Sequence, residues 1–268
     1  MTEKRPLERP IAGNTATNGL KVLALVFMIC DHVGKMLLPG VPELRILGRI
    51  AFPLYCWCLV VGFHYTRSPA KYCLRLLLIG LISQPLYMIA LNHTWREPNI
   101  MLTLLLGLLA LWGLREKRFG SQIWAPLAAL ALAVIFNANY NWRGVLLILL
   151  LWAAQERRTG IAAVMIAFCL FWGSTSTVVQ GLFGLSFRDL SALPTLNALL
   201  TPWLKLQALA VLALPFILLQ MRQNIRMPKW LGYAAYPGHL LLLWLAELLV
   251  NQQGTLERAI RVLGLPGA

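Results

Sequence analysis

Runs of apolar residues recur along the whole chain and are separated by short polar connections. These runs are 14–20 residues long, and about 20 consecutive apolar residues are needed for a helix to cross the hydrocarbon core of a bilayer. The pattern predicts an all-α fold, a bundle of about nine transmembrane helices in which the shorter runs are tilted or re-entrant. The expected ranges are 20–39, 46–64, 72–91, 99–114, 121–136, 142–155, 159–173, 203–220 and 232–250.

The composition agrees with a multi-pass membrane protein. Hydrophobic residues make up 59% of the chain and charged residues only 13%, whereas about 25% charged residues are usual in soluble domains. The net charge of +14 would suit nucleic-acid binding, but the lysines and arginines are scattered between the apolar runs. That distribution is typical of membrane topology, so we predict membrane lipids and no nucleic acid as partners.

The chain shows no motif for a metal or a resident cofactor. Its five cysteines all fall within expected spans, where thiols behave as small apolar side chains. Cys56 and Cys58 lie two positions apart, which places their sulfurs about 200° apart on a helix. A zinc motif, a phosphate-binding loop and a nucleophile elbow are all absent. We therefore predict no metal.

The polar ends of the chain define the predicted domain boundaries. Residues 1–18 contain two prolines and five charged residues, which predicts a short disordered cytoplasmic tail. No signal-peptide cleavage site is evident, so we expect the first apolar run to remain as an anchor. The prediction is a tail at 1–18, a single transmembrane domain at 19–251 and a short C-terminal tail at 252–268. Within the domain, 176–202 contains an amphipathic piece expected near the membrane interface.

Basic residues predict the orientation, because cytoplasmic connections are enriched in lysine and arginine. The N-terminal tail and alternate later connections hold fifteen of the 24 basic residues. The N-terminus is therefore expected in the cytoplasm of a bacterial inner membrane, and nine spans would place the C-terminus outside. These residues are Lys4, Arg5, Arg9, Lys21, Arg67, Lys71, Arg75, Arg115, Lys117, Arg118, Arg157, Arg158, Arg222, Arg226 and Lys229.

One connection departs from this rule. The segment 36–48 is expected outside, yet Lys35, Arg45 and Arg49 flank it. Two interpretations are open. These side chains extend to the outer lipid headgroups, or they face an anionic or polar substrate.

The first apolar run contains an Asp-His pair, Asp31 and His32. Ionisable residues at membrane depth cost about 2.5–3.5 kcal/mol on insertion scales and are usually functional. His32 is a candidate general base, acyl acceptor, metal ligand or structural histidine, and Asp31 either stabilises an imidazole or pairs with Lys35 at i+4. Lys21 lies eleven residues before His32, about 20° away around the helix and about 16 Å along it.

Other polar residues lie within or at the ends of later spans. Gln84 precedes Pro85, which predicts a kink, and its amide either completes the kink or faces a cavity. Asn99 is suited to cap the span that follows it. In the last span, Tyr236, His239 and Glu247 are expected to face the bundle interior.

Several of these residues occur together in a known family. The segments Lys21-x6-Met-x2-Asp31-His32, Gly48-Arg49-x-Ala-Phe-Pro-Leu54, Pro98-Asn-Ile100 and Tyr236-x2-His239-Leu240 resemble, in this order, the pattern of TraX. TraX is the integral-membrane acetylase of conjugative pilin. The similarity is best over 20–65, while 115–230 is similar only in hydropathy. The first two segments also resemble, more distantly, the start of the transmembrane acyltransferase superfamily.

The resemblance implies an acetyltransferase with acetyl-CoA as co-substrate and a pilin subunit as partner. Lys21, with Arg75 close by, would face the CoA phosphates, although the superfamily commonly has arginine in place of this lysine. His32 would be the catalytic histidine, as a base or as an acetyl acceptor, and Asp31 would stabilise its imidazolium. The remaining candidates for binding the acceptor or the oxyanion are Arg49, Gln84, His239, Asn99 and Tyr236.

Three other functions remain open at this point. In the first, the protein would be an O-acetyltransferase, and the acceptor of the acetyl group would be a glycan or lipid hydroxyl in place of an amine. Alternatively, Asp31, His32, His239 and Glu247 would form the relay of a small proton-coupled transporter, although the inverted repeats typical of transporters are not evident. Finally, a non-catalytic assembly factor would tolerate replacement of both Asp31 and His32.

Overall fold

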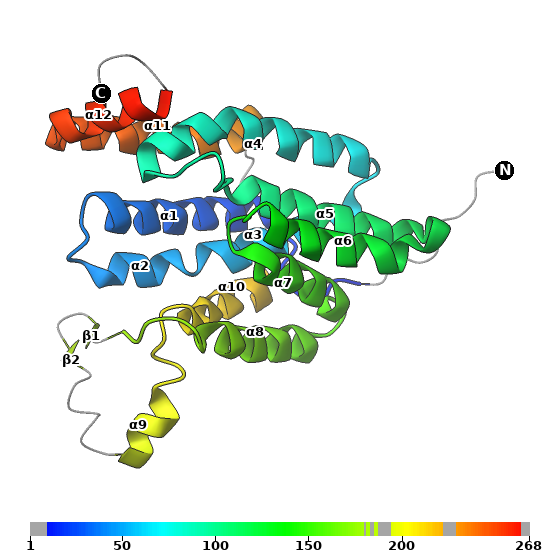
Figure 1. Ribbon diagram of the computed structural model, residues 1–268. Coiled ribbons are helices and arrows are strands. Elements are labelled where there is room, and N and C mark those ends of the chain that lie inside the picture. The colour runs from blue at the N-terminus through cyan, green and yellow to red at the C-terminus, as the bar shows by residue number, and fades with distance from the viewer. Residues whose placement is uncertain (1–9, 180, 183–184, 187–193, 222–228, 264–268) are drawn as a thin grey trace.

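The computed structural model describes residues 10–179, 181–182, 185–186, 194–221 and 229–263. Figure 1 shows a bundle of roughly aligned helices, which confirms the predicted all-α class. The only strands in these ranges form a small antiparallel ribbon, β1 (Gly181–Leu182) and β2 (Leu185–Ser186). The helices are α1 (Thr17–Met36), α2 (Pro42–Gly48), α3 (Ala51–Tyr65), α4 (Pro69–Leu91), α5 (Ile100–Glu116), η1 (Arg118–Gly120), α6 (Ser121–Ile135), α7 (Asn141–Ala154), α8 (Arg158–Gly173), α9 (Pro194–Leu200), η3 (Ala208–Ala213), α10 (Leu214–Leu218), α11 (Lys229–Val250) and α12 (Gln252–Leu263).

The helix α3 lies at the centre of the bundle, in contact with α1, α5, α7 and η3. It contains no aspartate, glutamate, lysine or arginine, and side chains all around it are buried, with Leu54, Trp57 and Phe63 fully enclosed. A helix that is apolar on every side is stable only when other elements surround it. α3 is therefore the element around which the core forms.

The helices α4 and α6 lie at the outside of the bundle, and each presents apolar side chains outward. Ile82 of α4 is 65% exposed and Leu127 of α6 is 61% exposed. Within the described residues, three helical segments are long and apolar enough to cross a membrane, namely Pro42–Tyr65, Pro69–Leu91 and Arg118–Ile135. The outward apolar faces of α4 and α6 are the surfaces that such an environment would cover.

Each of the nine predicted apolar runs coincides with helical structure, and the boundaries agree within five residues. The run 46–64 is divided into α2 and α3, and the run 203–220 into η3 and α10. That nine spans cross the membrane stays a prediction. α1 is not among the three long apolar segments, although it has 20 residues, because Lys21, Asp31 and Lys35 interrupt its apolar sequence.

The chain just before α1 is ordered, which corrects the prediction of a disordered tail for residues 11–18. The indole nitrogen of Trp57 donates a hydrogen bond to the carbonyl of Asn14 at 2.7 Å. The backbone N–H of Asn14 donates to the carbonyl of Ile217 at 2.6 Å, and the Asn14 side chain accepts from the N–H of Ala16 at 2.9 Å. These hydrogen bonds attach the segment to the core. Residues 1–9 lie outside the described ranges.

The predicted C-terminal tail is helical over most of its described length. α12 packs on α11 and α4, and it is strongly amphipathic. Arg258 of α12 forms an ion pair with Glu247 of α11 at 2.9 Å. Of the predicted amphipathic piece at 176–202, α9, the ribbon and residues 176–179 lie in the described ranges, and they extend from the side of the bundle in Figure 1.

Candidate functional site

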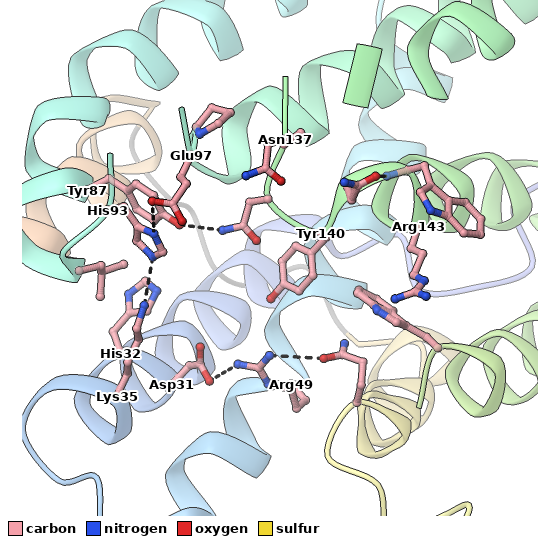
Figure 2. Close-up of a pocket in the computed structure, with 18 of the residues that line it drawn as sticks. Asp31, His32, Lys35, Arg49, Tyr87, His93, Glu97, Asn137, Tyr140 and Arg143 are labelled. Atoms are coloured by element: carbon pink, nitrogen blue, oxygen red, sulfur yellow. Dashed lines mark hydrogen bonds and ion pairs between the residues drawn. The ribbon is translucent and has the colours of Figure 1, made fainter. Parts of the chain in front are cut away.

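A pocket of about 790 Å³ lies at one end of the bundle (Figure 2). It is enclosed by the C-terminal part of α1, the junction of α2 and α3, the loop between α4 and α5, and the turn between α6 and α7. Most of its wall is polar. The lining residues are Asp31, His32, Lys35, Arg45, Arg49, Tyr87, Leu91, His93, Glu97, Pro98, Val134, Asn137, Ala138, Asn139, Tyr140, Asn141, Trp142, Arg143, Trp172 and Gln207.

Asp31 is paired with arginines of the neighbouring chain segment rather than with Lys35. Its Oδ1 accepts from Arg45 Nη1 at 3.1 Å and from Arg49 Nη2. Arg49 is 8% exposed, so it is buried in the bundle and does not extend to lipid headgroups. The i+4 pair expected from sequence is absent among the described contacts because Asp31 points toward α2, while Lys35 points toward the loop after α4.

Gly48 permits this pairing. A Cβ atom at position 48 would overlap the Cβ and Oδ1 atoms of Asp31. With no side chain there, α1 and α2 approach closely, and the carboxylate of Asp31 reaches the guanidinium groups of Arg45 and Arg49. The Gly-Arg dipeptide noted in the sequence therefore supplies both the space for the acid and its partner.

His32 meets His239, the histidine of the last predicted span. Its Nδ1 lies 3.1 Å from His239 Nε2, and the two ring planes are nearly parallel, at 11°. On the far side of His239, Nδ1 lies 3.0 Å from the carbonyl oxygen of Ala235. The predicted inward orientation of His239 is confirmed, since it is 5% exposed.

These contacts fix the protons on both rings. A carbonyl oxygen can only accept, so His239 Nδ1 carries a proton and the Nε2 of a neutral His239 is an acceptor. His32 Nδ1 must then donate to it. In the neutral ring the remaining nitrogen, His32 Nε2, is left with a lone pair, and it makes no hydrogen bond to any described residue. His32 thus has the protonation pattern of a base that faces the pocket.

The pocket is lined by a second histidine besides His32, one that the sequence analysis missed. His93, in the loop after α4, accepts a hydrogen bond from Lys35 Nζ at 3.0 Å, and its Nδ1 lies 3.4 Å from Glu97 Oε2. Its ring stacks on Tyr87, with 4.7 Å between centroids. The i, i+4 spacing of His93 and Glu97 directly before Pro98 was the available signal, but both residues lie outside the apolar runs.

The surroundings shift the pKa values of His93 and Glu97 downward. Partial burial lowers the pKa of His93 below its ordinary value of 6.5, and the nearby Lys35 ammonium lowers it further, while Glu97 opposes the shift. The backbone N–H of Thr94 donates to the Glu97 carboxylate, which lowers the pKa of that acid below 4.5. Near neutral pH, His93 is uncharged and is held between a cation and an anion.

Gln84 and Asn99 form a network that joins α4 to the start of α5. Gln84 Oε1 accepts from the Asn99 side chain at 2.9 Å, Gln84 Nε2 donates to the carbonyl of Glu97 at 3.2 Å, and Asn99 Oδ1 accepts from Met101 N at 3.0 Å. Neither residue lines the pocket. Their placement supports the predicted helix cap and leaves no free amide for a substrate oxyanion.

A second, smaller cavity of about 50 Å³ adjoins His32 on the inner side of the pocket. Its wall includes Met28, one turn before His32, the partly buried Tyr55 and the buried Tyr236. The ring of Tyr236 packs edge-on against His239, 5.3 Å away. This cavity has room for a group of only a few atoms beside the imidazole of His32.

The two residues expected to bind CoA lie away from both cavities. Lys21 is in the first turns of α1, on the side of the bundle where Cys58 lies. Arg75 is exposed on α4, with its guanidinium 5.5 Å from the ring of Tyr72. Neither lines the pocket around His32 or the small cavity beside it. In the part of the chain that the structure describes, no group of three or more histidine, cysteine, aspartate or glutamate residues could hold a metal ion.

Comparison with known proteins gives two curated relatives. A probable fimbrial assembly protein of Dichelobacter nodosus, FimC, is 37% identical over 139 residues, which cover 46% of this chain and 55% of the relative. An uncharacterized protein of Rickettsia prowazekii (strain Madrid E) is 34% identical over 88 residues, 33% of each chain. The matches thus span about half of one relative's length and a third of the other's.

No solved structure matches the chain. The sequence pattern that defines the TraX protein family, in contrast, matches residues 16–247, which include every helix from α1 to most of α11. This range holds both histidines and all the arginines that line the pocket, and also His239. The chain therefore belongs to the TraX family.

Proposed function

We propose that this chain is an acetyltransferase of the bacterial inner membrane. It would move an acetyl group from cytoplasmic acetyl-CoA to an acceptor amine, with His32 as general base and without a metal. The observation that carries this proposal concerns His32, which lines the polar pocket: its Nε2 makes no hydrogen bond to any described residue, while His239 and the Ala235 carbonyl fix the proton on the opposite nitrogen.

The chemistry needs one base that later acts as an acid. His32 Nε2 removes a proton from the acceptor amine as the amine nitrogen attacks the thioester carbonyl. The new C–N bond forms a tetrahedral intermediate, which collapses by breaking the C–S bond, and His32 returns the proton to the CoA thiolate. General acid–base help of this kind accelerates a reaction about 10²–10⁴-fold.

Three neighbours of His32 take distinct roles in this proposal. His239 is a positioning residue, because its Nε2 accepts from His32 Nδ1 and stabilises the imidazolium that forms after proton transfer. Asp31 makes no hydrogen bond with His32 among the described contacts, and instead orients Arg49. Arg49, on the pocket wall, is the candidate to stabilise the oxyanion, while Gln84 and Asn99 support the fold. The cavity bordered by Tyr236 would receive the acetyl methyl group.

The distribution of basic residues supports two separate entrances. Nine of the fifteen basic residues of the predicted cytoplasmic side have described side chains, and these lie at the end of the bundle away from the pocket, where Arg115 donates to the carbonyl of Phe63 and Arg158 to that of Leu218. We therefore place the N-terminus in the cytoplasm and the pocket mouth outside. Acetyl-CoA would bind at the rim near Lys21 and Arg75, and the small cavity would widen toward Met28 and Tyr55 to admit the thioester.

The family and the name of one relative support a pilin acceptor. A pilin subunit with a free N-terminal amine is the partner that the TraX resemblance implies, and the Dichelobacter nodosus relative is named as a fimbrial assembly protein. A membrane-inserted pilin would present its terminus to the outer pocket mouth. An O-acetyltransferase of a glycan or lipid would use the same histidine on a hydroxyl.

The contacts disfavour a proton-coupled transporter. The relay would require Asp31, His32, His239 and Glu247 to communicate. Glu247 is instead paired with Arg258 at 2.9 Å, and Asp31 is paired with two arginines. Among the described contacts, only the two histidines of the four touch each other.

Labelled acetyl-CoA tests the proposal directly. The full-length protein in lipid nanodiscs would be incubated with radiolabelled acetyl-CoA and a peptide with a free N-terminus, beside His32→Ala and a control variant, His64→Ala. His64 lies at the opposite end of α3, near Trp152. We expect acetyl transfer by the wild type and the control only. Equal transfer by His32→Ala would refute the role of His32.

A further inference from the structure

One half of the pocket has more positive than negative charge. We call the set Asp31, Arg45, Arg49, Arg143 and Gln207 the arginine half; all five line the pocket. The single carboxylate, Asp31, is shared by Arg45 and Arg49. Three guanidinium groups thus face one acid, and arginine stays charged at any physiological pH.

Among the described residues, Arg143 is the arginine of this half that has no acidic partner. Its Nη1 donates only to the neutral hydroxyl of Thr175, at 3.3 Å, and its Cζ lies 5.6 Å from the ring centre of Trp142. Its Nε is buried and has no hydrogen-bond partner among the described residues. A buried donor of a charged group that lacks a partner is costly. Figure 2 shows Arg143 on the wall opposite His32, with Tyr140 between them.

Arg49 contributes a second available donor group. Its Nη1 reaches Gln207 Oε1 only at 3.4 Å, near the limit of a hydrogen bond, so a better acceptor would displace the amide. The planar guanidinium group matches a carboxylate, which it binds through two parallel N–H···O bonds. The arginine half is therefore built for an anion.

We infer that the arginine half binds a carboxylate carried by the peptide acceptor, with Arg143 as its principal contact. This inference rests on the proposed function and specifies its substrate class as a peptide with a free N-terminal amine and an acidic residue a few positions away. The pocket wall favours a peptide over a phospholipid. Asn137, Asn139 and Asn141 line it with groups suited to peptide amides. Polar side chains outnumber the apolar ones, which are Leu91, Pro98, Val134, Ala138, Trp142 and Trp172, so most of the wall is unsuited to acyl chains.

Peptide binding tests the inference without requiring acetyl transfer. The full chain in nanodiscs would be titrated with hexapeptides that share a free N-terminus and carry aspartate or asparagine at one of positions two to five. Trp142 and Trp172 line the pocket, so tryptophan fluorescence reports binding. At one position we expect the aspartate peptide to bind at least about tenfold more tightly than its asparagine twin. Arg143→Gln should remove this preference, and Arg143→Lys should keep part of it.

The controls separate the possible failures. Arg118→Gln, at the opposite end of the bundle, should leave the preference intact, and thermal unfolding should show that all variants are folded. Equal affinity of every aspartate and asparagine pair, or a preference unchanged in Arg143→Gln, would overturn the inference. So would Arg143-dependent binding of a short-chain phosphatidic acid without any peptide preference, because the anion would then come from a lipid. Acetyl transfer is measured in the same samples, so that the proposed function is tested separately from the peptide preference.

Discussion

The arginine half of the pocket and its histidine half, which consists of His32, Lys35, His93 and Glu97, use adjacent residues of α1 in opposite ways. Asp31 points to charged partners on α2, and it accepts from both Arg45 and Arg49. Among the described residues, His32, the next residue, hydrogen-bonds only to the neutral ring of His239, and its other nitrogen makes no hydrogen bond. Neighbouring residues point about 100° apart on a helix, so two sequence neighbours serve two separate networks.

The difference teaches that the second nitrogen of a histidine decides its chemistry. His93 and His32 both line the pocket. Both nitrogens of His93 have charged partners, Lys35 and Glu97. The ring therefore stabilises the pocket rim and has no free nitrogen to act as a base. His32 has one partner, itself a histidine, and keeps a lone pair for a substrate.

The largest effect should distinguish these two histidines. His32→Ala should lower kcat/KM for acetyl transfer about 10²–10⁴-fold, because the base is lost. His93→Ala should lower it far less, since His93 makes no contact with His32. Both rates would be measured with labelled acetyl-CoA under the same conditions. A comparable loss of activity in the two variants would contradict the proposal that His32, and not His93, is the base.

Removing the charge of Asp31 should lower the stability of the folded protein rather than the rate of acetyl transfer. Asp31→Asn leaves Arg45 and Arg49 without a counter-charge, and breaking a fully buried pair costs roughly 3–5 kcal/mol. The loss should be smaller here because the Arg45 side chain is 30% exposed. Thermal unfolding in detergent would measure it, with Glu97→Gln at the exposed rim as control. If Asp31→Asn unfolds like the wild type but is inactive, Asp31 belongs to the chemistry.

Replacing the histidine behind His32 should have an intermediate effect. In His239→Ala the Nδ1 of His32 loses its acceptor, so the proton no longer has a fixed position. A loss of about 10–100-fold in kcat is expected, as for other histidines deprived of an orienting partner. His239→Gln, whose side-chain oxygen can accept, should recover part of the activity. A purely structural role for His239 predicts no such recovery when both variants are equally stable.

The smallest effect concerns the pH dependence of stability. Because the pKa of His93 is lowered from 6.5 in the folded protein, the unfolded chain binds this proton more readily, and stability falls as the pH decreases from about 6.5 toward the lowered pKa. His93→Gln should flatten this part of the curve. Glu97 acts in a lower window, since its stabilisation is lost only as the pH falls through its own pKa, which is below 4.5. An unchanged slope between pH 7 and 5 in His93→Gln would contradict the burial of a neutral ring.

The helices were predictable because their apolar runs are long and have clear polar ends. The breaks at 48–51 and within 203–220 were not, since both lie inside continuous apolar sequence. Gly48 explains the first break only once Asp31 is seen to press against it. The ordered segment before α1 was also missed, because its stability comes from distant partners such as Trp57 and Ile217.

The site could be predicted only in part, for a related reason. His32 and His239 were recognisable because ionisable residues inside apolar runs are rare, and the structure brings them into contact. The pairing of Asp31 with α2 was hidden, because the i+4 rule considers one helix at a time and favoured Lys35. His93 and Arg143 lie at run ends, where polar residues are ordinary and give no signal of their own.

The tight contact at Gly48 also limits how the protein can move. α1 and α2 have no space to slide past each other, so Asp31, His32 and Arg49 must travel together in any opening motion. We expect the moving wall to be α11, whose His239 side chain is joined to His32 of α1 by one hydrogen bond. Displacement of α11 would remove the acceptor that fixes the proton on His32 Nδ1. The motion that opens the pocket would therefore also stop His32 from acting as a base.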